Sequence, residues 1–386
     1  MFLIDAYFAG GNEKLFGCLV ATNRGQFGTA LSSQTNRRSY VTQPKDKRRL
    51  FHQVLLRLAI GLTTFTIFFF TQKTCRVHPM TICSSKGPLG KWQPYYDGLY
   101  SVMQLTFNLP QMIFFTLAGI VWGCMEGHLT VTPLMVFVAV FVMARVPFVG
   151  IGMSMCLHRY FAHGAFRTSR VFQFILACIS AMSLQGGALW WASKHLRHHK
   201  HCDTPLDPHS PTQTSYLYAW VGWLYFETHH DWAYLPQRLL TPEMLLINMF
   251  FLLPNMIVTA ALSTVVGKEW ALFLSWVPGL FGALATLHFN VDYHPDQKVP
   301  SDAAKCVSVN RESGDKGIGP VRLEWLAEHL PFLFEPLVGE AFHEDHHEFP
   351  RRAHRPGIDV PYLFILRPLE KLGIIWDLQQ PLKTTS

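Results

Sequence analysis

The stretch FQFILACISAMSLQGGALWWASKHLRHHKHCD (residues 172–203) begins as an apolar run and ends in four histidines within seven positions. The apolar part is about as long as the roughly 20 residues that a helix needs to cross a bilayer. Imidazole is a common metal ligand, so histidines crowded directly after such a run indicate a metal site beside a membrane-associated segment. The rest of the chain decides whether this run crosses the membrane and whether all four histidines share one role.

The composition of the chain points to a membrane protein. Apolar residues make up 49% of the 386 residues and charged residues only 15%, whereas about 25% charged residues is usual in soluble domains. The formal net charge of +7 is not gathered into a compact basic stripe, so we predict no nucleic-acid partner. The 19 histidines are the unusual feature.

Four apolar runs are long enough to span a bilayer, and they pair into two hairpins: 105–123, 129–146, 243–262 and 270–289. Two further runs are ambiguous. Residues 54–70 form a shorter run that contains Arg57, and residues 171–192 lead into the histidines. Residues 1–50 hold eight Lys or Arg against three acidic residues, which favours a disordered or targeting segment.

The side of the membrane on which the histidines lie follows from the number of spans between them. Histidines near positions 158, 195 and 343 can cooperate only if they lie on one side of the membrane. A crossing by 171–192 would put the clusters at 158 and 195 on opposite sides, so this run should lie in the membrane interface. Lys and Arg residues surround all three clusters, which indicates the cytosol, or the stroma of a plastid. If 54–70 crossed as well, the basic KDKRR (45–49) would reach the wrong side, so we favour an interfacial or targeting role and leave a span as the alternative.

We therefore predict an all-α integral membrane protein with four transmembrane helices in two hairpins and a cytosolic helical dome. The domain boundaries are residues 1–50 for the leader, 51–103 for an apolar, interfacial segment and loop, 104–376 for the membrane domain and 377–386 for the tail.

The histidines fall into three clusters with regular spacing: HRYFAH (158–163), HLRHH (195–199) and HEDHH (343–347). In the last two, positions i, i+3 and i+4 share one face of a helix, so each should present three imidazoles in one direction. The i, i+5 spacing of His158 and His163 does not align on an ideal helix and suits a helix end or ligands to different metals. Eight clustered imidazoles are too many for one ion. They predict two ions, and imidazole suits iron, zinc, copper or nickel.

The order of these clusters resembles that of the integral-membrane fatty acid desaturases, in particular their acyl-CoA Δ9 branch. The similar stretches are QGGALWWASKHLRHHKHCDTPLDPHSP (185–211), GEAFHEDHHEFP (339–350) and NVDYH (290–294). The resemblance covers roughly residues 90–370. The third cluster departs from it, because Glu344 and Asp345 stand where that branch usually has Asn and an aromatic residue. We expect these acids to orient imidazoles or to be solvated.

The resemblance implies a di-iron site in a cage of nine histidines, with Asn290 reaching a metal through water. The implied ligands are His158, His163, His195, His198, His199, His294, His343, His346 and His347. It also implies O2 as co-substrate and electrons from an external donor. The chain has no HPGG haem-binding motif, so a separate cytochrome b5 with its reductase is implied in the endoplasmic reticulum membrane, or ferredoxin in a plastid.

The resemblance further implies introduction of a cis double bond, at Δ9, into a long-chain acyl-CoA during unsaturated fatty acid synthesis. An acyl-lipid substrate, and a hydroxylase with the same cage, are the alternatives. Trp190 and Trp191 are candidates for an acyl-chain tunnel, and Arg159, Lys194 and Arg197 for a basic rim that meets a CoA phosphate or lipid headgroups. Among the remaining histidines, His201 matches a position without a ligand role. A histidine-rich metal transporter is disfavoured, because here the histidines flank the apolar runs.

Overall fold

The computed structural model describes residues 88–125, 144–292, 294, 340, 343–356 and 359–379. The predictions for residues 1–50 and 54–70, and for most of the span 129–146, lie outside the described residues.

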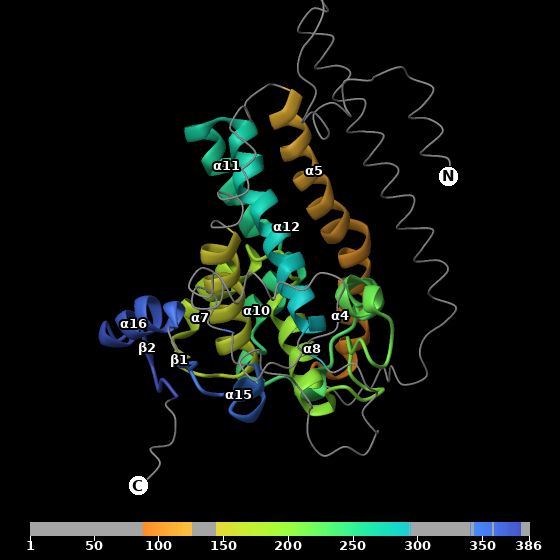
Figure 1. The fold of residues 1–386 in the computed structure, drawn as a ribbon, viewed down its shortest axis with the longest axis vertical. Coiled ribbons are helices and arrows are strands. Elements are labelled where there is room, and N and C mark those ends of the chain that lie inside the picture. The colour runs from red at the N-terminus through yellow and green to blue at the C-terminus, as the bar shows by residue number, and fades with distance from the viewer. Residues whose placement is uncertain are drawn as a thin grey trace, which may run out of the picture.

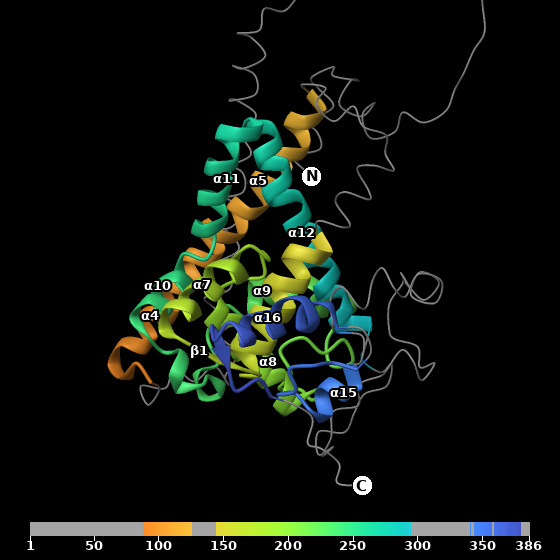
Figure 2. The same ribbon diagram turned by 90° about the vertical axis from the view of Figure 1, so that its left-hand side faces the viewer.

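Two helical runs among the described residues, Gly90–Val121 and Lys268–His288, are long and apolar enough to cross a membrane. The first consists of the 3-10 turn η1 (Gly90–Trp92), α4 (Gln93–Met103), the π-helical turn η2 (Gln104–Asn108) and most of α5 (Leu109–Met125). The second belongs to α12 (Lys268–Asp292). The predicted spans 105–123 and 270–289 fall within these helices. In both views α5, α11 and α12 stand side by side and project away from the rest of the molecule (Figures 1 and 2).

The predicted span 243–262 is not one straight helix. It divides into α10 (Pro242–Met249) and α11 (Leu253–Val266), which are bent by 67°. The cause is Pro254 in the first turn of α11: proline has no N–H to donate to the carbonyl of residue 250, and its ring clashes with a continuing helix. The described residues therefore contain two candidate spans, or three if the bent pair counts as one. The fourth predicted span, 129–146, lies mostly outside the described residues, so the prediction of four stays a prediction.

The opening apolar run also divides in two. Helix α7 (Arg170–Ala181) begins at Ser169, whose hydroxyl accepts a hydrogen bond from the N–H of Phe172, and α8 (Ala188–His201) follows after a tight connection. Gly186 has φ +95°, and a Cβ there would lie 2.7 Å from the ring of Trp190. The 12 residues of α7 extend about 18 Å, less than the bilayer core of about 30 Å. The prediction that 171–192 is not a continuous span agrees with this break, while its interfacial position stays a prediction.

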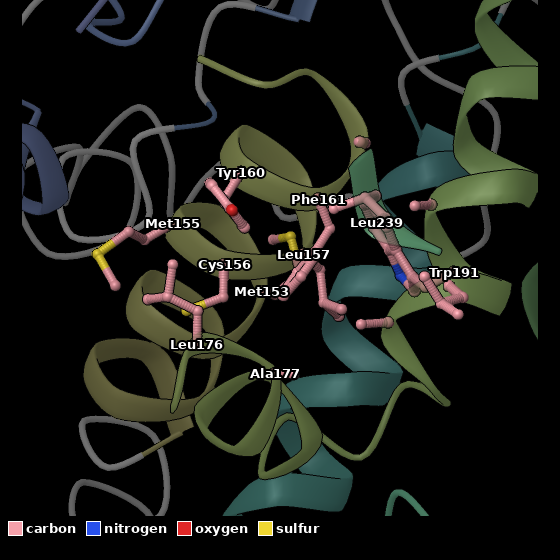
Figure 3. Packing of buried hydrophobic residues seen from close by; sticks show 14 of the residues in the cluster. Met153, Met155, Cys156, Leu157, Tyr160, Phe161, Leu176, Ala177, Trp191 and Leu239 are labelled. Carbon is pink, nitrogen blue, oxygen red and sulfur yellow. The ribbon is translucent and has the colours of Figure 1, made fainter. Parts of the chain in front are cut away.

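Residues Ala144–Ala162 form a π-helical segment, η3, which packs against α7, α8 and α12. Its buried side chains meet those of α7 and α8 in the main hydrophobic core. Figure 3 shows Met153, Leu157 and Phe161 of this segment near Trp191 and Leu239. Each fully buried large apolar side chain stabilises the fold by about 1.5–3 kcal/mol, so this core holds η3 and α8 in fixed relative positions.

Short elements complete the dome around α8. They are η4 (Tyr218–Gly222), α9 (Trp223–Phe226), η5 (Trp232–Tyr234), η6 (Gln237–Leu239), α15 (His343–Glu348), η8 (Tyr362–Leu366) and α16 (Arg367–Lys371). The strands β1 (Arg167–Thr168) and β2 (Ile375–Trp376) pair antiparallel, with Arg167 opposite Trp376. Apart from this two-residue ladder the described fold is helical. Helices α8 and α15 lie at the end of the molecule remote from α11 (Figure 2).

Candidate metal centre

Five imidazoles from three separate segments meet in a first histidine group: His158, His163, His195, His199 and His346. Their Nε2 atoms form a chain of short contacts, 3.0 Å from His158 to His346, 2.8 Å to His199, 3.0 Å to His195 and 2.9 Å to His163. Segment η3 provides His158, the residue directly after it is His163, α8 provides His195 and His199, and α15 provides His346. Five ring nitrogens directed at one point form a set of ligand atoms suited to a transition metal.

The π-helical backbone explains the spacing of the first pair. The N–H of His163 donates to the carbonyl of His158 at 3.1 Å, a hydrogen bond across five residues, and such a turn places residues i and i+5 on one face. The two rings lie 4.9 Å apart between centroids. Both belong to one group, at a helix end as the sequence suggested.

A second histidine group consists of His198, His294, His343 and His347. The Nε2 atoms of His343 and His347 are 3.1 Å apart, and the ring of His198 lies 5.0 Å from that of His294 and 5.3 Å from that of His347. The two groups are adjacent, because the rings of His199 and His347 stack at 4.2 Å. Together the groups contain all nine histidines that the sequence singled out.

Each H-x2-H-H cluster is shared between the two groups, which corrects the expectation that its three imidazoles act in one direction. On α8, His195 and His199 enter the first group and His198 the second. On α15 the division is reversed, since His346 enters the first group and His343 and His347 the second. Adjacent residues of a helix point about 100° apart, so His198 and His199 can serve neighbouring ions that lie side by side beneath the helix.

Three buried carboxylates hold the outer nitrogens of the rings. The Nδ1 atoms of His158, His198 and His294 lie 2.9 Å from Glu340, Asp207 and Asp203, respectively. The contacts of His198 and His294 are hydrogen bonds, and a ring whose Nδ1–H donates to a carboxylate has its Nε2 lone pair free for a metal. The sequence did not assign these acids a role. It considered Glu344 and Asp345 instead, but Asp345 pairs with Arg352 and the side chain of Glu344 lies outside the described residues.

His346 is oriented differently. The guanidinium of Arg355 donates to its Nδ1 at 2.8 Å, so the proton of the neutral ring sits on Nε2 as long as this hydrogen bond holds. Binding of a metal ion at Nε2 requires that this proton leave the ring, or that Arg355 turn away so that the proton can move to Nδ1.

The protonation states of the rings suit metal binding. Burial, followed by the proximity of other imidazoles, holds the pKa of His163, His195 and His199 well below the ordinary value. Burial similarly lowers the pKa of His343, His346 and His347. Neutral imidazole is the form that coordinates a metal. Nε2 of His294 is buried and has no hydrogen-bond partner within the described part of the chain, as expected for an atom whose partner is an ion.

Burial and nearby negative charge shift the pKa of His198, the ring that contacts Asp207, in opposite directions. Burial would lower the pKa of His198, but the neighbouring charges of Asp207 and Asp203 raise it. The pKa of Glu340 falls to about 2 despite its burial, because His158, Arg355 and Arg159 surround it. The residues present therefore fit two cations held by imidazole, with carboxylates in contact with the rings. Asn290 lies in α12, about one turn before His294, and its side chain is outside the described residues.

The two predicted tunnel tryptophans have different surroundings. Trp191 stacks on His195 with centroids 4.7 Å apart, and its indole N–H donates to Gln185. Trp190 is fully buried against Trp223 at 5.2 Å, and its N–H donates to the carbonyl of Glu227 at 2.7 Å. Only Trp191 touches the histidine groups, so the structure brings one of the two tryptophans to the candidate site.

The predicted basic rim is not an exposed rim in the structure. Arg159 is fully buried and pairs with Asp359 at 2.9 Å. Lys194 is 1% exposed and lies 2.9 Å from Glu227 and 2.8 Å from Asp231, which also pair with Arg197. Lys194 and Arg197 lie on the side of α8 that meets Glu227 and Asp231. The sequence pattern did not reveal this pairing because Glu227 and Asp231 lie some 30 residues further along the chain.

The remaining histidines of the region lie outside the two groups. Nε2 of His201 meets the hydroxyl of Tyr234 at 2.9 Å. His209 is buried and stacks on His198 at 4.5 Å, and its pKa falls to about 3, first through burial and then through the proximity of His198. His209 therefore supports the ring of His198 by packing.

Comparison with known proteins gives a consistent picture. A family model described as fatty acid desaturase matches residues 132–355. The hex-5-enoyl-[acyl-carrier protein] acetylenase of Moorena producens is 30% identical over 253 residues, 60% of this chain and 73% of the relative. The Delta(9)-fatty-acid desaturase fat-7 of Caenorhabditis elegans is 27% identical over 62% of this chain and 70% of its own length. The Delta-9 acyl-lipid desaturase 2 of Arabidopsis thaliana is 27% identical over 60% and 71%, respectively.

Proposed function

Since the chain belongs to the fatty acid desaturase family, we propose that it introduces a cis double bond into a saturated long-chain fatty acyl group, at Δ9. The observation that carries the proposal is the convergence of nine imidazoles in two adjacent groups at one end of apolar helices. The overall reaction converts –CH2–CH2– and O2, with two electrons and two protons, into –CH=CH– and two molecules of water.

Two iron ions would be held by the two histidine groups. The first group offers five imidazoles, and the second offers four together with Asn290 through a water molecule. The bound irons supply the O2 reduction and the removal of hydrogen from an unactivated methylene, which no amino-acid side chain can perform. We name no separate acid or base residue.

The contribution of the protein is position and protonation state. Asp207 and Asp203 keep the Nδ1 protons of His198 and His294 in place, which directs their Nε2 atoms inward, and Glu340 lies 2.9 Å from Nδ1 of His158. Burial keeps the other rings neutral. Trp191, stacked on His195, offers an apolar surface beside the first group for the acyl chain. The dense packing around the groups keeps bulk water away from the reacting carbon atoms.

We further propose that the histidine end faces the cytosol from the endoplasmic reticulum membrane, and that cytochrome b5 with its reductase supplies the electrons. The basic residues around the histidine clusters support this orientation. A plastid membrane with ferredoxin as donor is the alternative, and the donor's identity would distinguish the two.

The acyl carrier is proposed to be CoA, with a membrane lipid as second candidate. One observation favours the lipid: the two positive charges of Lys194 and Arg197 are balanced by the two negative charges of Glu227 and Asp231. A balanced set offers little attraction to the phosphates of CoA. Two of the relatives are named for carriers other than CoA, an acyl-carrier protein and an acyl lipid.

Expression in a desaturase-deficient yeast, followed by mass spectrometry of its fatty acids, tests the proposal. A new cis double bond is expected, and its position gives the regiochemistry. An iron-containing protein that makes no double bond would contradict the proposal, and a hydroxylated product would identify a hydroxylase. Microsomes supplied with labelled acyl-CoA or labelled phosphatidylcholine would then distinguish the carriers.

A further inference from the structure

Helix α8 carries three of the nine histidines, yet its first turn has no capping side chain of its own. The N-cap residue is Gly187. The first N–H groups of a helix have no partner within the helix, and an N-cap side chain usually accepts from the second or third of them. In α8 these are the N–H groups of Leu189 and Trp190.

Asn248 of helix α10 takes over this role from a distant part of the chain. Its Oδ1 accepts from the N–H of Leu189 at 2.9 Å and from the N–H of Trp190 at 3.0 Å. Gly187 is required for this approach, because a Cβ at that position would overlap Oδ1 of Asn248. Asn248 is fully buried.

A second set of hydrogen bonds fixes which way the amide of Asn248 points. Its Nδ2 donates to Nε2 of His230 at 2.9 Å and to the hydroxyl of Tyr96 at 3.1 Å. His230 therefore carries its proton on Nδ1, which donates to Asp97 at 2.8 Å, and Tyr96 donates to the carbonyl of Leu245 at 2.7 Å. The other carboxylate oxygen of Asp97 accepts from the indole of Trp232 at 2.7 Å. Each donor in this series of hydrogen bonds has an acceptor, so the amide oxygen of Asn248 can face only α8.

We propose that Asn248 is a positioning residue for the metal centre, and that Asp97 and His230 hold it in place. This inference rests on the proposed function. His195 lies six residues beyond Leu189 on the same helix, about 9 Å along its axis. A shift of the first turn therefore displaces the histidines of both groups together. The network also ties α4 and the apolar helix α10 to the helix that presents the ligands.

The test measures the rate of iron release. This rate should rise when helix α8 is displaced, but not when a variant only lowers the stability of the fold elsewhere. The full-length protein is loaded with ferrous iron in detergent and challenged with a ferrous chelator. Loss of partners that orient metal ligands typically lowers metal affinity about 10–100-fold, so Asn248→Ala should release iron roughly tenfold faster. Asn248→Asp keeps an acceptor for α8 but loses the Nδ2 donor to His230 and Tyr96, so its rate of iron release should lie between those of the wild type and Asn248→Ala.

Asn255→Ala is the matched control, because Asn255 is equally buried and hydrogen-bonds to the carbonyl of Ser275 in the apolar pair α11 and α12. Both alanine variants should lower the melting temperature of the metal-free protein, and only Asn248→Ala should speed iron release. Equal release from the two variants, or release from Asn248→Ala at the wild-type rate, would overturn the inference.

Gly187→Ala provides an independent test should Asn248→Ala fail to fold. The added methyl group separates Asn248 from α8 and leaves Asn248 itself intact, so iron release should again be faster. Gly98→Ala is its control, since a Cβ there meets no atom within 4 Å. Slow release from Gly187→Ala would refute the positioning role. A wild-type protein that binds no iron would instead refute the proposed function, which separates the two failures.

Discussion

Helix α8 has two sets of side chains that carry basic nitrogen atoms, and the surrounding protein gives the two sets different charge. On one face His195, His198 and His199 converge with other imidazoles, and burial keeps His195 and His199 neutral. On the face that meets Glu227 and Asp231, Lys194 and Arg197 pair with these two acids, and the pKa of Glu227 falls to about 2 in spite of its burial. The first face leaves lone pairs free for a ligand, and the second satisfies its charges within the protein.

The largest effect is expected from His198→Ala, which removes a ligand from the second group. Desaturation should be abolished, and purified protein should retain about one iron ion per chain instead of about two, because the first group does not include this ring. Product analysis and elemental analysis measure the two outcomes. Wild-type iron content in this variant would show that His198 is not a ligand.

The next effect is expected from Asp207→Asn, which weakens the partner of His198 without removing a ring. Iron affinity should fall about 10–100-fold, as measured by competition with a chelator. Asp345→Asn is the control, since Asp345 pairs with Arg352 and not with a histidine of either group. Similar losses in both variants would argue against a specific role for Asp207.

Acidification should affect the two faces over different pH ranges. The folded pKa values of His163, His195 and His199 lie below that of an unfolded histidine, about 6.5. The unfolded chain therefore takes up protons first, so stability and iron retention are fully present above pH ~6.5 and decline below it.

The acidic partners of Lys194 and Arg197 take up protons only at lower pH. The depressed pKa of Glu227 contributes stability above its unfolded value of about 4.5, and this is lost only as the pH falls towards about 2. Iron retention measured between pH 7.5 and 5.5 checks the first range, and a flat profile there would contradict it. Glu227→Gln should leave that profile unchanged in shape.

Lys194→Met separates stability from substrate binding on the cationic face. Removing one member of a buried ion pair costs about 3–5 kcal/mol, so chemical denaturation should show a large loss of stability. The KM for acyl-CoA should change less than about twofold, because the paired charge attracts the CoA phosphates weakly. A much larger rise in KM would restore Lys194 to the substrate site.

The smallest effect is expected from His201→Ala. This ring bonds Tyr234 and lies outside both groups, so the change removes one hydrogen bond worth about 0.5–1.5 kcal/mol. Iron content and product yield should match those of the wild type. Loss of iron would bring His201 back among the ligand candidates.

Much of the candidate site could be read from spacing and resemblance. The three clusters and His294 do meet, as the resemblance implied. The division of each cluster between two groups could not be read in this way, since it depends on how α8 and α15 face one another. The i, i+5 pair needed the π-helical turn, which its spacing alone did not predict.

Most of the predictions that needed revision concern partners from distant segments, and one concerns a local break. Arg159 and Lys194 looked like surface cations because their partners Asp359, Glu227 and Asp231 are far away in the sequence. The span 243–262 looked continuous in hydropathy, although Pro254 bends it. Asn248 looked like an ordinary residue of an apolar run, and only its contacts with Leu189 and Trp190 connect it to the site.

The sequence by itself determined the apolar helices and the three histidine clusters, because hydropathy and helical spacing are properties of short stretches. The resemblance to the fatty acid desaturases then implied the full set of nine histidines, His294 included. The tertiary structure alone decided which rings share a group, which carboxylates hold them and which cations are neutralised. Those outcomes depend on contacts between residues up to about 200 positions apart, such as Arg159 and Asp359. Burial makes these contacts important for stability, because charges and polar groups withdrawn from water must find partners within the protein.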